Sequence, residues 1–173
     1  FVPWYALEYY DVTQEKMLVE QGEYRFSAGA SSADIRQELE CTVSGEVIPP
    51  RNLSHSICIK NYDSKHGIEI TLRFSYRKND WYGCTNDWGG SFTFADADFA
   101  GYTKAELWAA APCSQAGVTI YAGEQQLGSV EILPSRSMDD FQLYTIPLKP
   151  YTGQADLRLE ITGMASVYRI QLG

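Results

Sequence analysis

Two triplets of the same residue types stand close together in this chain. Asn79-Asp80-Trp81 and Asn86-Asp87-Trp88 begin seven residues apart, and Tyr82 lies between them. An aromatic ring offers a flat apolar face that can pack on the C–H face of a sugar ring, while amide and carboxylate groups hydrogen-bond its hydroxyls. Placed on a surface loop, these residue types could bind a carbohydrate.

Further rings and a cation occur later, in or beside expected loops. The candidate carbohydrate-binding residues are Trp81, Tyr82, Asn86, Asp87, Trp88, Phe141, Tyr168 and Arg169. The alternative is that the rings fill the core. For Trp108, which stands between Leu107 and Ala109, we favour the core; for Trp81 and Trp88 both interpretations stay open.

Hydrolytic chemistry has little support in the sequence. Only two histidines occur, His55 and His66, and neither a G-x-S-x-G elbow nor a phosphate-binding glycine loop is present. Asp96 and Asp98 are two residues apart and would share one face of a strand, as two glycosidase carboxylates must lie near each other. No apolar surroundings suggest a raised pKa, so we interpret the pair as a solvated edge or a calcium contact and predict no catalytic residue in this segment.

Charge limits the partners. The chain has 14 basic and 22 acidic side chains, a net charge of −8. Such a surface repels phosphate backbones and anionic lipid, so neither nucleic acid nor a membrane is an expected partner. Cys41, Cys58, Cys84 and Cys113 lack the spacing of a metal knuckle. Free thiols are the favoured interpretation, a disulfide stays open, and a bacterial cytoplasmic or a secreted protein fits equally.

Apolar residues alternate with polar ones along much of the chain, which predicts strands. The clearest such segments are Thr119–Ala122, Gly128–Leu133, Tyr144–Leu148, Asp156–Ile161 and Val167–Leu172. Short strands separated by turn residues predict an all-β, antiparallel β-sandwich. The polar, glycine-containing stretch Tyr76–Gly90 is instead expected to be a structured loop.

The most linker-like stretch is Ser44–Asn52, because tandem prolines cannot occupy a central strand. We therefore expect one segment over residues 1–50 and a sandwich over residues 51–173.

The first segment resembles a known domain. Ala6–Asp11, Val19–Tyr24 and Gly29–Ile35 look like the last strands of the fibronectin-III-like domain of family 3 glycoside hydrolases. The resemblance implies a parent enzyme of the β-glucosidase or β-xylosidase class, with its catalytic domains upstream. Half of such a sheet has raw edges, so residues 1–43 are expected to pair with the sandwich, another chain or an upstream segment.

The second segment is similar to a family 6 carbohydrate-binding module, a jelly-roll sandwich of the galactose-binding-like type. The similarity is carried by Asn61–Asp63, Gly67–Ile68, Gly89–Phe94, Asp98–Phe99, Ala105–Ala110, Leu127–Val130, Phe141–Tyr144 and Asp156–Leu159. It implies a sugar held between two loop aromatics, one in the Trp81–Trp88 stretch and one at Phe141, where the family usually has tryptophan. Arg169 replaces the family's asparagine.

The family often holds a structural calcium with acids on its first and last strands. Those positions are Cys58, Lys60 and Gln171 here, so no cofactor is expected. The resulting hypothesis is a non-catalytic module that binds a β-glycan or oligosaccharide. The alternative is a structural sandwich that packs on the parent's catalytic domains or mediates dimerisation, with self-association through residues 1–43.

Overall fold

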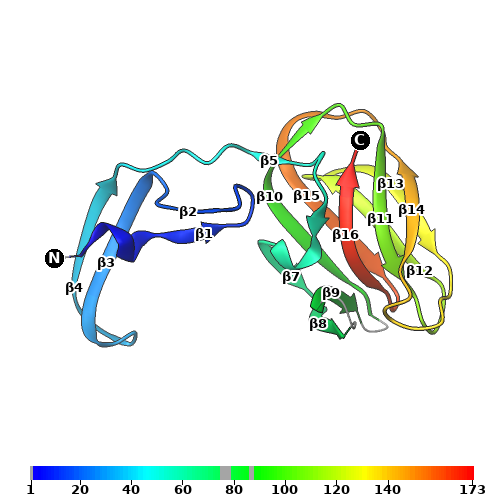
Figure 1. The fold of residues 1–173 in the computed structure, drawn as a ribbon, viewed down its shortest axis with the longest axis horizontal. Helices are drawn as coiled ribbons and strands as arrows, with labels where there is room; N and C mark the ends of the chain where they lie inside the picture. Colours follow the sequence, from blue (N-terminus) through cyan, green and yellow to red (C-terminus); the bar gives the residue numbers. More distant parts are fainter. Residues whose placement is uncertain (1, 75–78, 86–87) are drawn as a thin grey trace. The chain divides into compact units, whose positions relative to one another are not determined.

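The structure is a computed structural model that describes residues 2–74, 79–85 and 88–173 (Figure 1). Its backbone divides into two compact units, Phe1–Pro49 and Pro50–Gly173. Apart from two short 3-10 turns, the regular structure of the described residues consists of strands, which confirms the prediction of an all-β protein. Within these residues, no helix is long and apolar enough to cross a membrane.

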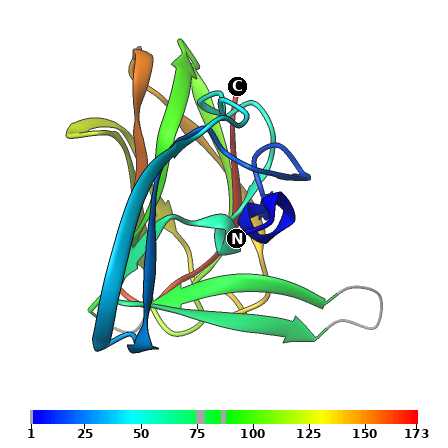
Figure 2. The same ribbon diagram turned by 90° about the vertical axis from the view of Figure 1, so that its left-hand side faces the viewer.

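The first unit contains two separate two-stranded antiparallel sheets. A 3-10 turn, η1 (Trp4–Leu7), precedes the short pair β1 (Tyr9–Asp11) and β2 (Lys16–Leu18). The longer pair, β3 (Gly22–Ser31) and β4 (Asp34–Val43), forms a hairpin of ten residues per strand, which Figure 2 shows in blue and cyan. We call this pair the β3–β4 ribbon.

The two faces of the β3–β4 ribbon differ in polarity because side chains alternate along a strand. On one face Tyr24 and Phe26 stack with ring centroids 6.4 Å apart, and Phe26 lies opposite Leu39, whose side chain is 64% exposed. On the other face Arg25 pairs with Glu40 at 3.1 Å. A two-stranded sheet is only marginally stable in water by itself. The apolar face is therefore suited to packing against another surface.

The second unit is a sandwich of two sheets. Its strands are β5 (Arg51–Asn52), β6 (Ile57–Cys58), β7 (Ser64–His66), β8 (Ile68–Phe74), β9 (Asn79–Thr85), β10 (Gly90–Ala100), β11 (Lys104–Ala110), β12 (Ala116–Ala122), β13 (Gln125–Ile132), β14 (Gln142–Pro147), β15 (Thr152–Thr162) and β16 (Ser166–Leu172). One sheet has the order β13-β12-β15-β10-β5, with β7 also paired to β10. The other has the order β14-β11-β16-β9-β8, with β6 paired to β16.

The core lies between the two sheets and follows the alternation of the sequence. Val118 and Ile120 on β12 are fully buried, as are Phe92 and Phe94 on β10. Every residue of the large buried cluster falls between Leu53 and Leu172. The second unit therefore has a hydrophobic core of its own, and the predicted antiparallel β-sandwich is confirmed.

The expectation that Tyr76–Gly90 forms a loop is wrong for Asn79–Thr85, which is the strand β9. This strand pairs with β8 over seven residues and with β16 at Gly83 and Cys84. Gly83 is required by packing, because a Cβ there would lie 2.1 Å from Cζ of Phe92. Pairing on both sides and contact with the core thus override a composition that is typical of a loop.

A buried hydroxyl joins the end of β9 to the turn between β15 and β16. Thr85 Oγ1 donates a hydrogen bond to the carbonyl of Gly163 at 2.7 Å and accepts one from the amide of Ala165 at 2.9 Å. Replacing Thr85 by valine keeps the shape but leaves both backbone groups without this partner. We expect the free energy of unfolding to fall by about 1–3 kcal/mol, measured by urea denaturation. Thr85→Ser, which retains the hydroxyl, is the matched control; equal losses in both variants would show that the methyl group, and not the hydrogen bonds, is responsible.

Candidate functional site

Three aromatic rings meet on the sheet β14-β11-β16-β9-β8. Gly83 on β9 lies opposite Val167 on β16, so Tyr82 and Tyr168 occupy neighbouring positions on adjacent strands. Phe141 comes just before β14 and contacts both rings. Its centroid is 5.4 Å from that of Tyr82, edge to face, and 5.3 Å from that of Tyr168, stacked at 26°. We call Tyr82, Phe141 and Tyr168 the ring cluster.

The rings differ in exposure, which decides which of them a ligand can reach. Tyr82 is buried, with 8% of its surface exposed, whereas Phe141 and Tyr168 are half-buried. Tyr82 therefore supports the cluster from below, and the other two rings offer the accessible faces. A ligand would contact Phe141 and Tyr168 first.

The ring cluster is closed and is not a slot. The resemblance implies a sugar between two aromatics, one of them Phe141 and the other from Trp81–Trp88. Tyr82, within that stretch, touches Phe141 directly, since centroids 5.4 Å apart are at ordinary ring–ring contact distance. Phe141 and Tyr168 are in similar contact. A sugar would therefore stack on the outside of the cluster and not between its rings.

A β-bulge brings a positive charge to the cluster. The register between β11 and β16 shifts between Trp108 and Ala109. Trp108 lies opposite Arg169 and Ala109 lies opposite Val167, so the pairing with β11 skips Tyr168. Such a bulge redirects side chains. Arg169 follows directly, and its guanidinium carbon lies 4.2 Å from the centroid of the Tyr168 ring. The structure thus brings together four of the predicted residues: Tyr82, Phe141, Tyr168 and Arg169.

Trp108 belongs to the same face, contrary to the expectation that it lies in the core. Its neighbours Leu107 and Ala109 are fully buried, whereas Trp108 is half-buried and lies outside the core cluster. It pairs with Arg169 on β16 and with Leu143 on β14, and directly paired residues share a face. The signal that could have identified it is the alternation of small buried residues along Ala105–Ala110.

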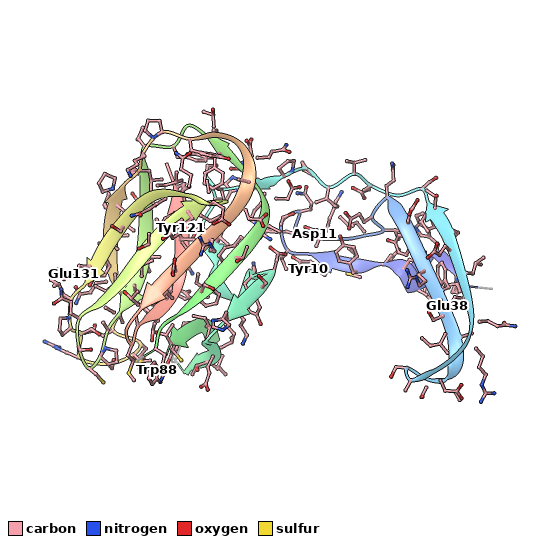
Figure 3. The ribbon with its side chains drawn as sticks, turned by 180° about the vertical axis from the view of Figure 1, so that it is seen from behind. Tyr10, Asp11, Glu38, Trp88, Tyr121 and Glu131 are labelled. Atoms are coloured by element: carbon pink, nitrogen blue, oxygen red, sulfur yellow. The ribbon has the colours of Figure 1, made fainter. Side chains whose placement is uncertain are left out.

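Of the remaining predicted residues, Trp88 is described and the others lie wholly or partly outside the description. The Trp88 indole is 92% exposed, in the segment between β9 and β10, and Figure 3 labels it. Asn86 and Asp87 lie outside the described residues, as does the side chain of Trp81. Trp88 therefore stays a separate candidate for stacking on a sugar.

A cleft of about 420 Å³ lies over parts of β8 and β9 and the turn between β15 and β16. It is lined by Gly67, Ile68, Glu69, Cys84, Thr85, Met138 and Met164. Cys84 lies two residues beyond Tyr82 and therefore on the same face of β9. The Ser166 hydroxyl approaches Sδ of Met138 at 3.6 Å, which ties the segment before Phe141 to β16. The cleft could extend a binding surface that begins at the rings.

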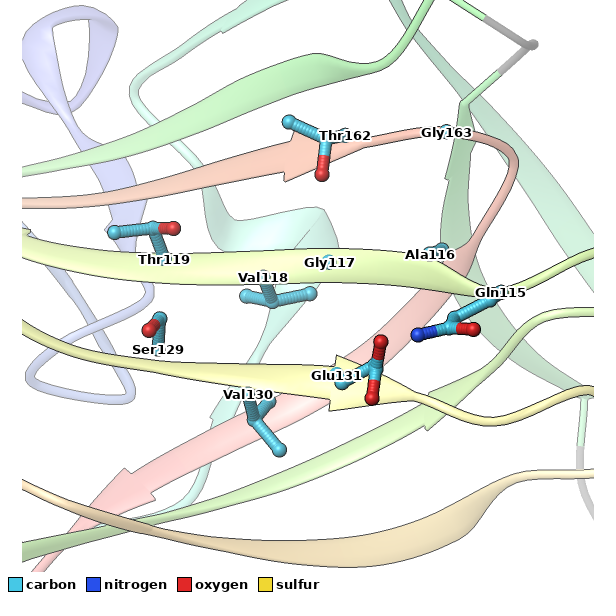
Figure 4. A pocket seen from close by; sticks show the side chains of 10 residues that line it. All are labelled: Gln115, Ala116, Gly117, Val118, Thr119, Ser129, Val130, Glu131, Thr162 and Gly163. Atoms are coloured by element: carbon cyan, nitrogen blue, oxygen red, sulfur yellow. The ribbon is translucent and has the colours of Figure 1, made fainter.

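A second hollow, of about 500 Å³, lies on the other sheet over β12, β13 and the end of β15 (Figure 4). Its ten lining residues include Thr119, Ser129, Glu131 and Thr162, and none of the ten is aromatic. Without a ring face it lacks the feature that makes a sugar stack. We therefore place the candidate site at the ring cluster, although this hollow is larger.

The residues at the family's calcium positions do not fit that ion. Calcium takes oxygen ligands, whereas Cys58 and Lys60 offer none from their side chains. The Gln171 amide nitrogen donates to the carbonyl of Ser54 at 2.7 Å. Among the described residues, no group of three or more histidine, cysteine, aspartate or glutamate side chains is placed to hold a metal.

No protein-family model and no curated protein sequence matches the chain. Several solved structures do. A family 6 module of Clostridium stercorarium, in complex with cellobiose, has a TM-score of 0.64 and 21% identity, covering 73% of this chain and 98% of that one. A β-1,3-glucan-binding family 6 module of Bacillus halodurans has a TM-score of 0.64 and 17% identity. The match covers 70% of this chain and 96% of that one.

A longer protein contains a similar fold. An arabinoxylan arabinofuranohydrolase of glycoside hydrolase family 43 from Bacillus subtilis, in complex with cellotetraose, has a TM-score of 0.66 and 10% identity, covering 84% of this chain but only 32% of that one. At these identities the likeness establishes the fold. This chain contains the β-sandwich found in family 6 carbohydrate-binding modules.

Proposed function

We propose that residues 50–173 form a non-catalytic carbohydrate-binding module and that the ring cluster with Arg169 is its sugar platform. The observation that carries the proposal is the pair of half-buried rings, Phe141 and Tyr168, stacked at 5.3 Å beside a guanidinium. The fold shared with sugar-binding modules supports it. The ligand stacks on the accessible ring faces, and the Arg169 and Tyr168 side chains bond its oxygens.

We further propose that the module belongs to a glycoside hydrolase of the β-glucosidase or β-xylosidase class, with residues 1–49 as the end of a fibronectin-III-like domain. The sequence pieces quoted above support this parentage. The amphipathic β3–β4 ribbon also supports it, because one face is suited to cover the rest of a sandwich. In this arrangement the module holds the parent's catalytic domains near their glycan.

Isothermal titration calorimetry tests the binding function. The chain is titrated with cello-, xylo- and β-1,3-gluco-oligosaccharides and with their uronate-bearing counterparts. We expect saturable binding of at least one sugar, together with a change in tryptophan fluorescence. A flat response to the whole panel in a sample that unfolds cooperatively would refute the proposal.

A structural role is the second candidate, and the exposed apolar face of the β3–β4 ribbon favours it. On this view the chain self-associates through residues 1–43 or packs on catalytic domains, without binding sugar. Light scattering during size-exclusion chromatography tests whether the chain self-associates. The full chain would be a dimer and residues 50–173 a monomer; a monomeric full chain would exclude self-association.

A further inference from the structure

Arg169 differs from a typical surface arginine in its surroundings. It lies on β16 with Trp108 on one side and Cys58 on the other. Its guanidinium carbon is 4.2 Å from the Tyr168 centroid, and its Nη2 donates a hydrogen bond to the Tyr168 hydroxyl. Its neighbours are therefore aromatic and sulfur-containing side chains instead of acids.

The guanidinium has unused hydrogen-bonding capacity. The Nε of Arg169 is buried and has no hydrogen-bond partner, so a ligand would meet the terminal Nη1 and Nη2 groups, of which Nη2 donates one hydrogen bond to the Tyr168 hydroxyl. Among the described residues, no carboxylate lies within 4.0 Å of Arg169 as an ion-pair partner. Within the described ranges, the Tyr168 ring face is what offsets the desolvation of this half-buried positive charge.

The two acids that come just before Phe141 are engaged with their own loop. Asp139 accepts a hydrogen bond from the Ser137 hydroxyl at 2.5 Å, and Asp140 accepts one from the amide of Arg136 at 3.2 Å. Both precede Phe141 on its loop. Neither of these two carboxylates is therefore placed to pair with Arg169.

We infer that the sugar bound at the ring cluster is acidic: a uronic acid whose carboxylate pairs with Arg169 while its ring stacks on Phe141 or Tyr168. The planar guanidinium presents parallel N–H donors that match a carboxylate, which an asparagine cannot do. The inference rests on the proposed function and names its ligand class. The net negative charge opposes this ligand only weakly, because distant charges are screened beyond about 8 Å at physiological salt.

A matched pair of ligands tests the inference. One is a xylo-oligosaccharide bearing a glucuronic acid branch, and the other is the same compound with the carboxyl group reduced to the alcohol. Calorimetry on the full chain at 150 mM salt is expected to give at least tenfold tighter binding of the acidic sugar. In Arg169→Gln the two affinities should become equal, because the preference for the carboxylate is lost together with the guanidinium. Arg169→Lys keeps the positive charge but lacks the parallel N–H donors of the guanidinium. It should retain only part of the preference for the acidic sugar.

The outcomes separate the two proposals. Equal affinities for both sugars in the wild-type chain, or a preference that survives Arg169→Gln, would overturn the acidic ligand and leave the carbohydrate-binding function intact. Binding of neither sugar, in a chain that binds another sugar of the panel, would overturn the acidic ligand alone, whereas a flat response to the whole panel would overturn both. Cooperative urea unfolding of Arg169→Gln shows that the variant is folded.

Discussion

Replacing Phe141 by alanine is expected to weaken glycan binding about 30-fold, equivalent to about 2 kcal/mol. Phe141 is the central ring of the cluster, since it contacts both Tyr82 and Tyr168. Its loss removes a stacking face and also frees Tyr168 to move, so the platform becomes smaller and less rigid. Calorimetry with the tightest ligand of the panel measures the change.

Trp88→Ala is the matched control because it also removes one aromatic ring from the same unit. The Trp88 indole is 92% exposed, so its loss should disturb neither the fold nor the ring cluster. We expect affinity to change less than threefold. The opposite pattern, with Trp88→Ala deleterious and Phe141→Ala neutral, would move the sugar site to the segment between β9 and β10.

The largest expected effect on stability comes from Phe92→Ala, about 3–5 kcal/mol of unfolding free energy. Phe92 is fully buried, packs against Tyr62 with centroids 5.9 Å apart, and lies directly beneath the backbone of Gly83. The substitution leaves a cavity under β9, the strand that carries Tyr82. Glycan affinity should fall as well, because the support of the ring cluster loosens.

Urea denaturation followed by tryptophan fluorescence measures this loss. A Trp4→Phe background is used, so that the remaining indoles, Trp81, Trp88 and Trp108, all report on the second unit. Phe92→Leu, which refills most of the volume, should cost clearly less. A cost below about 1 kcal/mol for Phe92→Ala would mean that the sandwich collapses around the gap with little penalty.

Strands in which apolar and polar residues alternate could be predicted from the sequence. The strand Asn79–Thr85, which lacks this alternation, was missed. Ile120 and Ala122 point into the core where the pattern placed them. Asn79–Thr85 has no such pattern, because Gly83 occupies the inward position against Phe92 and contributes no apolar side chain. A glycine that lets the β9 backbone approach Phe92 closely adds no apolar side chain to the pattern. This strand is therefore recognised only in the tertiary structure.

The residue types of the candidate site could be recognised in the sequence, but the contacts among them could not. Phe141, Tyr168 and Arg169 were identifiable as surface rings and a cation. Their arrangement depends on the register shift between β11 and β16 at Trp108 and Ala109. The local amino-acid composition does not predict this shift. The same register shift involves Trp108. Its position on the outer face can be recognised only after the small residues on either side of it are assigned to the core.

The hydrophobic core that runs from Leu53 to Leu172 has a consequence for how such a chain evolves. Because every residue of this buried cluster falls within the segment after Pro50, a gene segment that begins there would encode a unit with a core of its own. Duplication or transfer of that segment would deliver an intact binding surface to an unrelated enzyme, without compensating changes in the recipient. The acidic-sugar recognition proposed for Arg169 would be inherited together with that segment.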